Sequence, residues 1–204
     1  MAEFVLSEAE FNVLSDRDFM PIKQEVCRKL EGLLAELRGR LKGTLLENEG
    51  VWPESWLNGV GKISKGENYQ SYAWRVLDFP ATFDQQDWFT FRTVVLWGHP
   101  IGFHLILSGI WKDRLGQHLL HHRGALELDW YLSDQTSPWL WEYPHPDLIP
   151  LMEASQDQCQ DMLARHAFLK LSHFQPLKRY AQLPKDGNRA WMDLEQILKA
   201  GLAL

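Results

Sequence analysis

The middle of the chain places several strand-like runs so close together that helices cannot connect them. Runs rich in β-branched and aromatic residues occupy 71–79, 88–97 and 101–112, and 125–132 alternates apolar with polar residues, as strands do. A crossover between parallel strands needs a dozen or more residues, usually folded as a helix. The spacing therefore predicts an antiparallel sheet of about four strands in a meander, with a hairpin at 98–100.

Helical periodicity flanks the strand runs on both sides. Between positions 22 and 41, apolar residues recur three and four apart, which predicts a helix of about twenty residues with one buried stripe. A second seam predicts a long helix over about 150–172, and apolar residues between 194 and 202 predict a short final helix. We therefore expect one α+β domain over residues 1–204, in which an N-terminal helix and two C-terminal helices pack on the sheet.

Composition and charge restrict the classes of function. The chain carries a formal charge of −6, whereas general nucleic-acid binders and binders of acidic membranes need a basic face. No run approaches the ~18 apolar residues of a membrane span, and the acidic N-terminus is unlike a signal peptide, so we expect a cytoplasmic protein. Two cysteines are too few for a disulfide scaffold, and no CxxC, GxGxxG or Walker motif is present, so we expect no cofactor and no metal.

The first candidate site is the stretch 61–69, GKISKGENY. Lysines, a serine and a flexible glycine in a loop can hold an anion through side chains and backbone N–H groups. The alternative is a solvated turn that leads into the first strand. The residues of this predicted ligand loop are Lys62, Lys65, Glu67, Asn68 and Tyr69.

A second candidate is a set of polar residues on the predicted sheet. Strand alternation places Arg92 opposite to its apolar neighbours, and it places His104 likewise on the next strand. Glu127 and Asp129 fall on the polar face of the fourth predicted strand. If these faces coincide, the four side chains form a cluster that binds a polar ligand or performs acid–base chemistry. The alternative is a structural ion pair between Arg92 and Asp129.

Two further groups carry less specific signals. His118, His121 and His122 include an i,i+4 pair that suits zinc, but HLLHH lacks the glutamate of HExxH, and an exposed basic turn is the favoured interpretation. The aromatic segment 138–150, PWLWEYPHPDLIP, predicts an extended arm or surface loop. Exposed, it would bind a protein partner through Trp139, Trp141 and Tyr143, because aromatic residues dominate binding hot spots; buried, it would act as a lid over the core.

Four short strings resemble the pattern of an uncharacterised bacterial protein family. They are KISKGENY at 62–69, LDFP at 77–80, FRT at 91–93 and WG at 97–98. The resemblance implies a bacterial, cytoplasmic protein and implies no activity, cofactor or site residues. It directs attention to the predicted ligand loop and to the strand that carries Arg92.

Two functional hypotheses follow from these patterns. The first is a non-catalytic binding or adaptor module that recognises a protein partner or a small polar ligand through the 62–69 loop, the sheet face and the aromatic segment. It is favoured by the ten tryptophans and by the absence of a complete catalytic motif. The second is an enzyme in which His104 works with Asp129 or Glu127, while Lys65 or Arg92 holds an anionic substrate. Assembly into a homo-oligomer is left open by the sequence.

Overall fold

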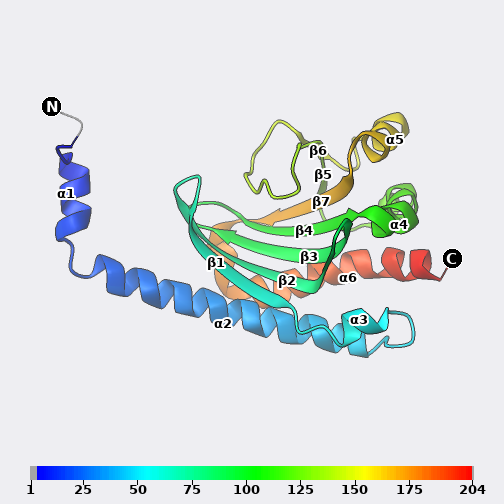
Figure 1. Cartoon of the computed structure of the whole chain (residues 1–204), viewed down its shortest axis with the longest axis horizontal. Helices are drawn as coiled ribbons and strands as arrows, with labels where there is room; N and C mark the ends of the chain where they lie inside the picture. Colours follow the sequence, from blue (N-terminus) through cyan, green and yellow to red (C-terminus); the bar gives the residue numbers. More distant parts are fainter. Residues whose placement is uncertain (1–3, 204) are drawn as a thin grey trace.

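A seven-stranded antiparallel sheet forms the centre of the computed structural model, which describes residues 4–203 (Figure 1). The strands lie side by side in the order β1-β2-β3-β4-β7-β5-β6. Their bounds are β1 (Lys62–Tyr69), β2 (Tyr72–Asp84), β3 (Asp87–Leu96), β4 (Ile101–Ser108), β5 (Trp130–Ser133), β6 (Leu148–Pro150) and β7 (Phe168–Gln175). The predicted antiparallel α+β class and the 98–100 hairpin are confirmed, because β3 and β4 pair directly across that link.

The helices lie beneath the sheet and near the ends of its strands (Figure 1). They are α1 (Glu8–Ser15), α2 (Phe19–Leu46), α3 (Glu54–Leu57), α4 (Gly109–His121), α5 (Gln156–Arg165) and α6 (Leu183–Leu202), with short 3-10 turns η1 (Arg123–Ala125) and η2 (Leu177–Gln182). Helices α2, α4 and α6 contact the sheet, and α2 also packs along α6. Helix α1 stands apart from the sheet at the N-terminal end (Figure 1) and buries none of its residues.

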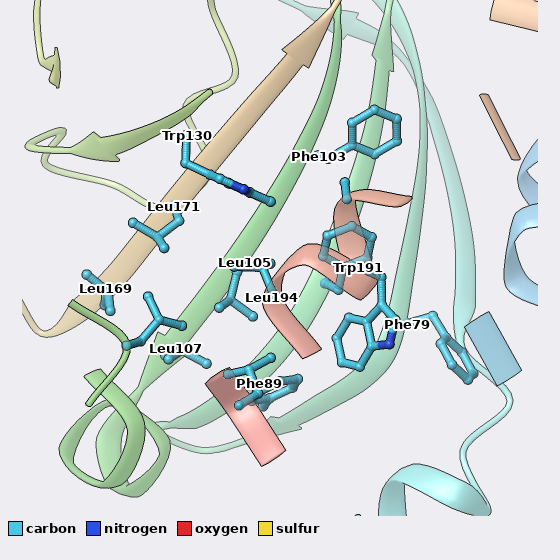
Figure 2. Packing of buried hydrophobic residues seen from close by; sticks show 14 of the residues in the cluster. Phe79, Phe89, Phe103, Leu105, Leu107, Trp130, Leu169, Leu171, Trp191 and Leu194 are labelled. Atoms are coloured by element: carbon cyan, nitrogen blue, oxygen red, sulfur yellow. The ribbon is translucent and has the colours of Figure 1, made fainter. Parts of the chain in front are cut away.

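The main core lies between the sheet and these helices. Figure 2 shows Phe79, Phe89 and Phe103 of the sheet around Trp191 of α6, and the ring centroids of Phe89 and Trp191 lie 6.5 Å apart. Aromatic pairs at such distances add packing energy beyond the area they bury. Several of the ten tryptophans therefore serve this core, among them Trp56, whose side chain is fully buried.

Helix α2 follows the predicted periodicity and is longer than predicted. Its buried stripe runs along Leu30, Leu34, Leu37 and Leu41, as the spacing indicates. Gly43 does not end the helix, because Leu45, one turn beyond the stripe, is buried as well. A glycine within a helix costs about 1 kcal/mol relative to alanine, which burial of a leucine offsets.

Two of the predicted strands have different bounds. Segment 101–112 leaves the sheet at Ser108, and α4 begins at Gly109, whose φ of +52° suits glycine. A Cβ at Gly109 would lie 1.9 Å from Asp87 Oδ1, and that oxygen accepts a hydrogen bond from the N–H of Ile110 at 2.9 Å. Segment 125–132 becomes strand only from Trp130 onward. The predicted number of four strands was too low, because β1, β6 and β7 also belong to the sheet.

The predicted helix over 150–172 was wrong at both ends, because only residues 156–165 are helical. Ser155 begins α5 with a capping box, and α5 ends at Arg165. The chain then enters β7, which pairs with β4 on one side and β5 on the other and so occupies the centre of the sheet. The predicted meander is consequently limited to β1–β4.

Two predicted loops also form regular structure. The 62–69 stretch is the edge strand β1, paired with β2. The polar stretch before Gly187 belongs to η2 and the start of α6. Gly187 is required there by close packing, because a Cβ would lie 2.6 Å from the side chain of Leu37.

Candidate functional site

The strand register aligns polar side chains across the sheet. From β1 inward, the residues directly opposite one another in successive strands are Lys62, Asp78, Arg92, His104, Ser172 and Tyr131. Side chains alternate between the two faces along each strand, and the neighbours Phe91, Leu105 and Leu171 belong to the core beneath the helices. This polar row therefore lies on the opposite face. Arg92 and His104 therefore share a face, which was the condition for the predicted cluster.

Asp78 and Arg92 form a buried ion pair at the centre of the polar row. Arg92 Nε and Nη2 donate to the two carboxylate oxygens of Asp78 at 2.7 and 2.9 Å, and the Thr90 hydroxyl donates to Oδ1 at 3.0 Å. The guanidinium carbon also lies 4.3 Å from the ring centroid of Trp139 and 5.9 Å from that of Trp141. Both the carboxylate and the aromatic rings therefore compensate the charge of Arg92.

His104 is a neutral imidazole inside the protein. Its side chain is fully buried, and Nδ1 lies 2.9 Å from the hydroxyl oxygen of Ser172. Burial lowers the pKa of His104 well below its usual value, and the positive charges of Lys170 and Arg92 lower it further. Gly102 leaves space for the ring, because a Cβ at that position would lie 2.4 Å from His104 Nε2.

Lys170 is the second cation on this face and is almost completely buried. Its ammonium group donates to Gln135 Oε1 at 3.2 Å and to the carbonyl oxygen of Leu140. Burial lowers the pKa of Lys170 to about 7, and the charge of Arg92 acts in the same direction, whereas the charge of Glu142 raises the pKa. The amine is therefore divided between its charged and neutral forms near neutral pH.

The segment between β5 and β6, residues 134–147, covers the polar row, and we call it the arm. Trp141 of the arm stacks on Tyr69 of β1, with ring centroids 4.4 Å apart, and meets Trp74 of β2 edge-on. Tyr143 stacks on Phe174 of β7 at 4.3 Å. These contacts attach the arm to β1 and β2 at one edge of the sheet and to β7, which lies on the far side of β4. The arm is therefore partly buried over the polar face of the sheet, whereas the predicted alternative was a lid over the core, which lies on the other face.

Hydrogen bonds fix the arm as well. The hydroxyl of Tyr69 accepts from the backbone N–H of Trp141 at 3.1 Å and donates to Glu142 Oε1 at 3.0 Å. Burial raises the pKa of Tyr69 to about 12, so the hydroxyl remains protonated and can donate. On the β5 side, the hydroxyl groups of Tyr131 and Tyr143 lie 3.0 Å apart.

Several buried polar atoms between the sheet and the arm have no hydrogen-bond partner within residues 4–203. They are His104 Nε2, Gln135 Nε2, Trp141 Nε1 and Glu142 Oε2. More than nine in ten buried polar groups in proteins have a partner, and a buried orphan costs about 1–3 kcal/mol. The amide nitrogen of Gln135 and the indole nitrogen of Trp141 are donors, and the carboxylate oxygen of Glu142 is an acceptor. Four of the ten such atoms among the described residues therefore belong to this layer, as donors and acceptors that a small polar molecule could pair.

The predicted ligand loop does not form one site. Lys65 and Glu67 lie toward α2, where Lys65 is 3.5 Å from Glu31 and Glu67 is 2.6 Å from Lys23. Arg75 of β2 joins both carboxylates. Such an ion-pair network links the edge strand to the helix, so these two residues lie in a strand–helix contact, and the predicted alternative of a solvated turn is wrong for them.

The other members of the predicted loop have separate roles. Asn68 accepts a hydrogen bond from the N–H of Ser71 at 3.2 Å, in the turn between β1 and β2. Lys62 is exposed at the outer end of the polar row. Besides Lys62, which belongs to the row, Tyr69 reaches the candidate site, because it contacts the arm.

Glu127 and Asp129 do not join His104. They lie on the exposed segment before β5, on the side of α6, because the Asp193 carboxylate of α6 accepts from the N–H of Glu127 at 2.8 Å. The carbonyl of Asp129 is bonded to His173, which lies on the helix-covered face. The ion pair predicted between Arg92 and Asp129 is replaced by the pair with Asp78.

The histidine group lies at the end of a helix rather than in a turn. His118 and His121 occupy the last turn of α4, and the ring centroids of His118 and His122 are 4.2 Å apart. Within residues 4–203, no group of three or more histidine, cysteine, aspartate or glutamate side chains has the arrangement to hold a metal ion. Cys27 and Cys159 are both free and buried.

Several residues of the candidate site are absent from the sequence prediction, namely Asp78, Tyr131, Gln135, Glu142, Lys170 and Ser172. A signal for Lys170 exists in the run FLKLSHFQ at 168–175, where polar and apolar residues alternate as in a strand. Gln135 and Glu142 lie in irregular structure, for which alternation gives no face.

The chain shows no relationship that would assign a function to this site. Over residues 4–203, no helix is both long and apolar enough to cross a membrane. Comparisons with protein-family models, with curated proteins and with solved structures find no match for this sequence. The resemblance to an uncharacterised bacterial family stays a prediction, and the geometry of the polar row and the arm supplies the evidence for function.

Proposed function

We propose that this protein is a non-catalytic binding protein that holds a small polar ligand between the polar row and the arm. The observation that carries this proposal is the set of four buried, unpartnered polar atoms in that layer. Proteins rarely leave such atoms unpaired, and binding sites present a few convergent polar groups within an otherwise apolar surround. The aromatic rings of Trp139, Trp141 and Tyr143 supply that surround.

The donors and acceptors limit the chemistry of the ligand. A matching molecule accepts hydrogen bonds from Gln135 Nε2 and Trp141 Nε1 and donates one to Glu142 Oε2. Arg92 is already neutralised by Asp78, whereas Lys170 contacts only neutral acceptors at hydrogen-bond distance among the described residues. An anionic group of the ligand would therefore be placed at Lys170. A small molecule with a carboxylate or similar group and at least one hydrogen-bond donor fits these requirements.

The arm must move for the ligand to enter. Gln135, Trp141 and Glu142 belong to the arm, while His104 and Lys170 belong to the sheet. Closure of the arm therefore assembles the two halves of the site and removes the ligand from water, which strengthens each polar contact.

Catalysis has weaker support than binding. The enzyme hypothesis requires an acid–base partner for His104, and its partner at Nδ1 is the hydroxyl of Ser172. Asp129 and Glu127 are exposed on the segment that contacts α6. The site thus has groups that hold a molecule in place and lacks the carboxylate–histidine pair that the hypothesis proposed.

Native mass spectrometry of the chain purified from its expression host tests the proposal. We expect a non-covalent adduct of small mass that is lost on denaturation, and we expect Lys170→Met to abolish it. Lys185→Met, which removes an exposed lysine of α6, is the matched control and should retain the adduct.

If no adduct is found, a second measurement is made on the same variants. Small-molecule extracts of the host are fractionated and added to wild type and to Lys170→Met, and the melting temperature is recorded. At least one fraction should stabilise wild type and Lys185→Met but not Lys170→Met. No adduct together with no stabilising fraction would overturn the proposal.

A further inference from the structure

Helix α1 is well formed, yet it has no core to pack on. A capping box joins Ser7 and Glu10 at its start, and none of its residues is buried. Large apolar side chains at and before this helix are exposed, namely Phe4, Val5, Leu6, Phe11, Val13 and Leu14. An isolated helix of eight residues is marginal in water, because most helix stability in proteins comes from packing of an apolar face. Such a helix needs a surface to cover it.

The same chain has an apolar groove of matching size. It has a volume of about 490 Å³ and lies between α2, the end of β3 and η2. Its apolar lining comes from Ile22, Val26, Leu30, Trp97, Leu177 and Tyr180. On α2 the lining extends over nine residues, from Ile22 to Leu30, which corresponds to about 13 Å of helix. Helix α1, with eight residues, is about 12 Å long.

Charge also matches between the helix and the groove. Glu8 and Glu10 lie in the first turn of α1, whose eight residues include no basic residue. Lys29 is the one charged side chain among the residues that line the groove. It shares the carboxylate of Glu25 with Arg28, so these three side chains together keep one net positive charge beside the groove. Opposite charges at the rim of an interface favour the correct partner and suppress others.

The link between α1 and α2 keeps the helix away from the groove of its own chain. Only residues 16–18 separate the two helices. Asp16 has extended backbone geometry, and its side chain accepts a hydrogen bond from the N–H of Asp18 at 2.8 Å. This short, fixed link directs α1 outward from the body (Figure 1). A short hinge of this kind favours exchange of a segment between copies.

We propose that two copies of this chain form a symmetric dimer in which α1 of each copy packs into the apolar groove of the other. The exchange covers both the exposed apolar residues of α1 and the exposed part of the α2 stripe, including Ile22 and Val26. The partner is thus a second copy of this chain. The proposal is independent of the ligand site, which lies on the other face of the sheet.

Light scattering after gel filtration measures the assembly. Wild type should have twice the chain mass of 23.8 kDa. Phe11→Asp combined with Leu14→Asp should convert the dimer to a folded monomer, because both side chains are exposed in the single chain. Glu36→Gln, on an exposed face of α2 away from the groove, is the control and should remain dimeric. A wild type that is monomeric throughout a 100-fold dilution series, starting at high micromolar concentration, would overturn the proposal.

Cross-linking between labelled copies separates exchange from other dimers. Two variants are mixed: Phe11→Cys in unlabelled chain and Tyr180→Cys in ¹⁵N-labelled chain. The mixture is allowed to re-equilibrate and is then treated with a short bis-maleimide. Wild type treated in the same way gives the background from Cys27 and Cys159. We expect peptides that join position 11 of one isotope to position 180 of the other. A dimer without this mixed cross-link, or a link formed only within one chain when both cysteines are placed together, would overturn the proposal.

Discussion

Asp78 and Arg92 face each other across β2 and β3 and are joined by two parallel hydrogen bonds of 2.7 and 2.9 Å. The carboxylate is 3% exposed and the guanidinium side chain 13%, so water compensates neither charge well. The pair fixes the position of Arg92 beneath Trp139, and it therefore connects the sheet to the arm.

Removal of the carboxylate should be costly. Asp78→Asn leaves Arg92 buried without a counter-charge, and breaking a buried pair in this way costs about 3–5 kcal/mol. Chemical denaturation of the variant measures the loss in free energy of unfolding. Glu36→Gln breaks the exposed pair with Arg40 and should change stability by less than about 1 kcal/mol. Equal effects of the two substitutions would contradict the assignment of Asp78–Arg92 as a buried pair.

Lys170→Met should stabilise the protein in the absence of ligand. Methionine is one atom shorter than lysine, and the substitution removes a buried ammonium group whose hydrogen-bond partners among the described residues are neutral. Relief of this buried charge should gain on the order of a few kcal/mol and outweigh the loss of the two hydrogen bonds. Equilibrium unfolding in urea at pH 7 gives the difference. Lys185→Met, which changes an exposed lysine, should have little effect. A large loss of stability in Lys170→Met would show that the contacts with Gln135 and Leu140 outweigh the burial of charge.

The gain from Lys170→Met should depend on pH with a defined sign. In the folded protein the pKa of Lys170 is about 7, below the 10.5 of the unfolded chain. Between these values the unfolded chain binds more protons, so the stability of wild type rises with pH. The advantage of the variant should therefore be fully present below pH 7 and shrink as pH rises toward 10.5. Urea unfolding of both proteins at pH 6.5, 8 and 9.5 measures this trend, and a constant difference would contradict it.

The sequence was informative where a short connection fixes the pairing of two strands. The short link at 98–100 predicted the antiparallel pairing of β3 with β4. Strand alternation separated Arg92 and His104 from their apolar neighbours, and the register that places them on one face comes from the structure. The stripe of α2 was likewise predicted, because leucines at helical spacing have one simple solution.

The sequence was misleading where helical spacing continues by chance into residues that form a strand. Met152, Cys159 and Met162 suit a helix, and His166 and Leu169 continue the same spacing by chance. That coincidence concealed β7 and with it Lys170. Asp129 was placed on the sheet face because the alternation began too early, whereas the strand starts at Trp130. The remaining site residues depend on the arm, whose position is set by long-range aromatic contacts that no local pattern encodes.

Gly102→Ala should destabilise the protein through His104. The added Cβ would lie 2.4 Å from His104 Nε2 and 2.9 Å from Cε1, so the buried ring must shift and its bond to Ser172 must weaken. Overpacking of this kind costs about 1–3 kcal/mol, measurable by thermal or urea unfolding. Gly124→Ala is the control, since a Cβ there meets nothing within 4 Å. Equal stability of both variants would mean that the His104 ring has free space around it.

Tyr69→Phe should loosen the arm without disturbing the helix-covered core. The substitution removes the hydroxyl that bonds the N–H of Trp141 and the carboxylate of Glu142, and it leaves both groups without this partner, at a cost of about 1–3 kcal/mol. We expect faster amide hydrogen exchange over 138–147, with the exchange rates of α2 and α6 unchanged. Tyr72→Phe, which changes an exposed tyrosine of the adjacent strand, should leave the arm protected. Because closure of the arm assembles the proposed site, Tyr69→Phe should also weaken retention of the bound molecule. Unchanged exchange over 138–147 would show that the aromatic stacking of Trp141 and Tyr143 holds the arm without the hydroxyl.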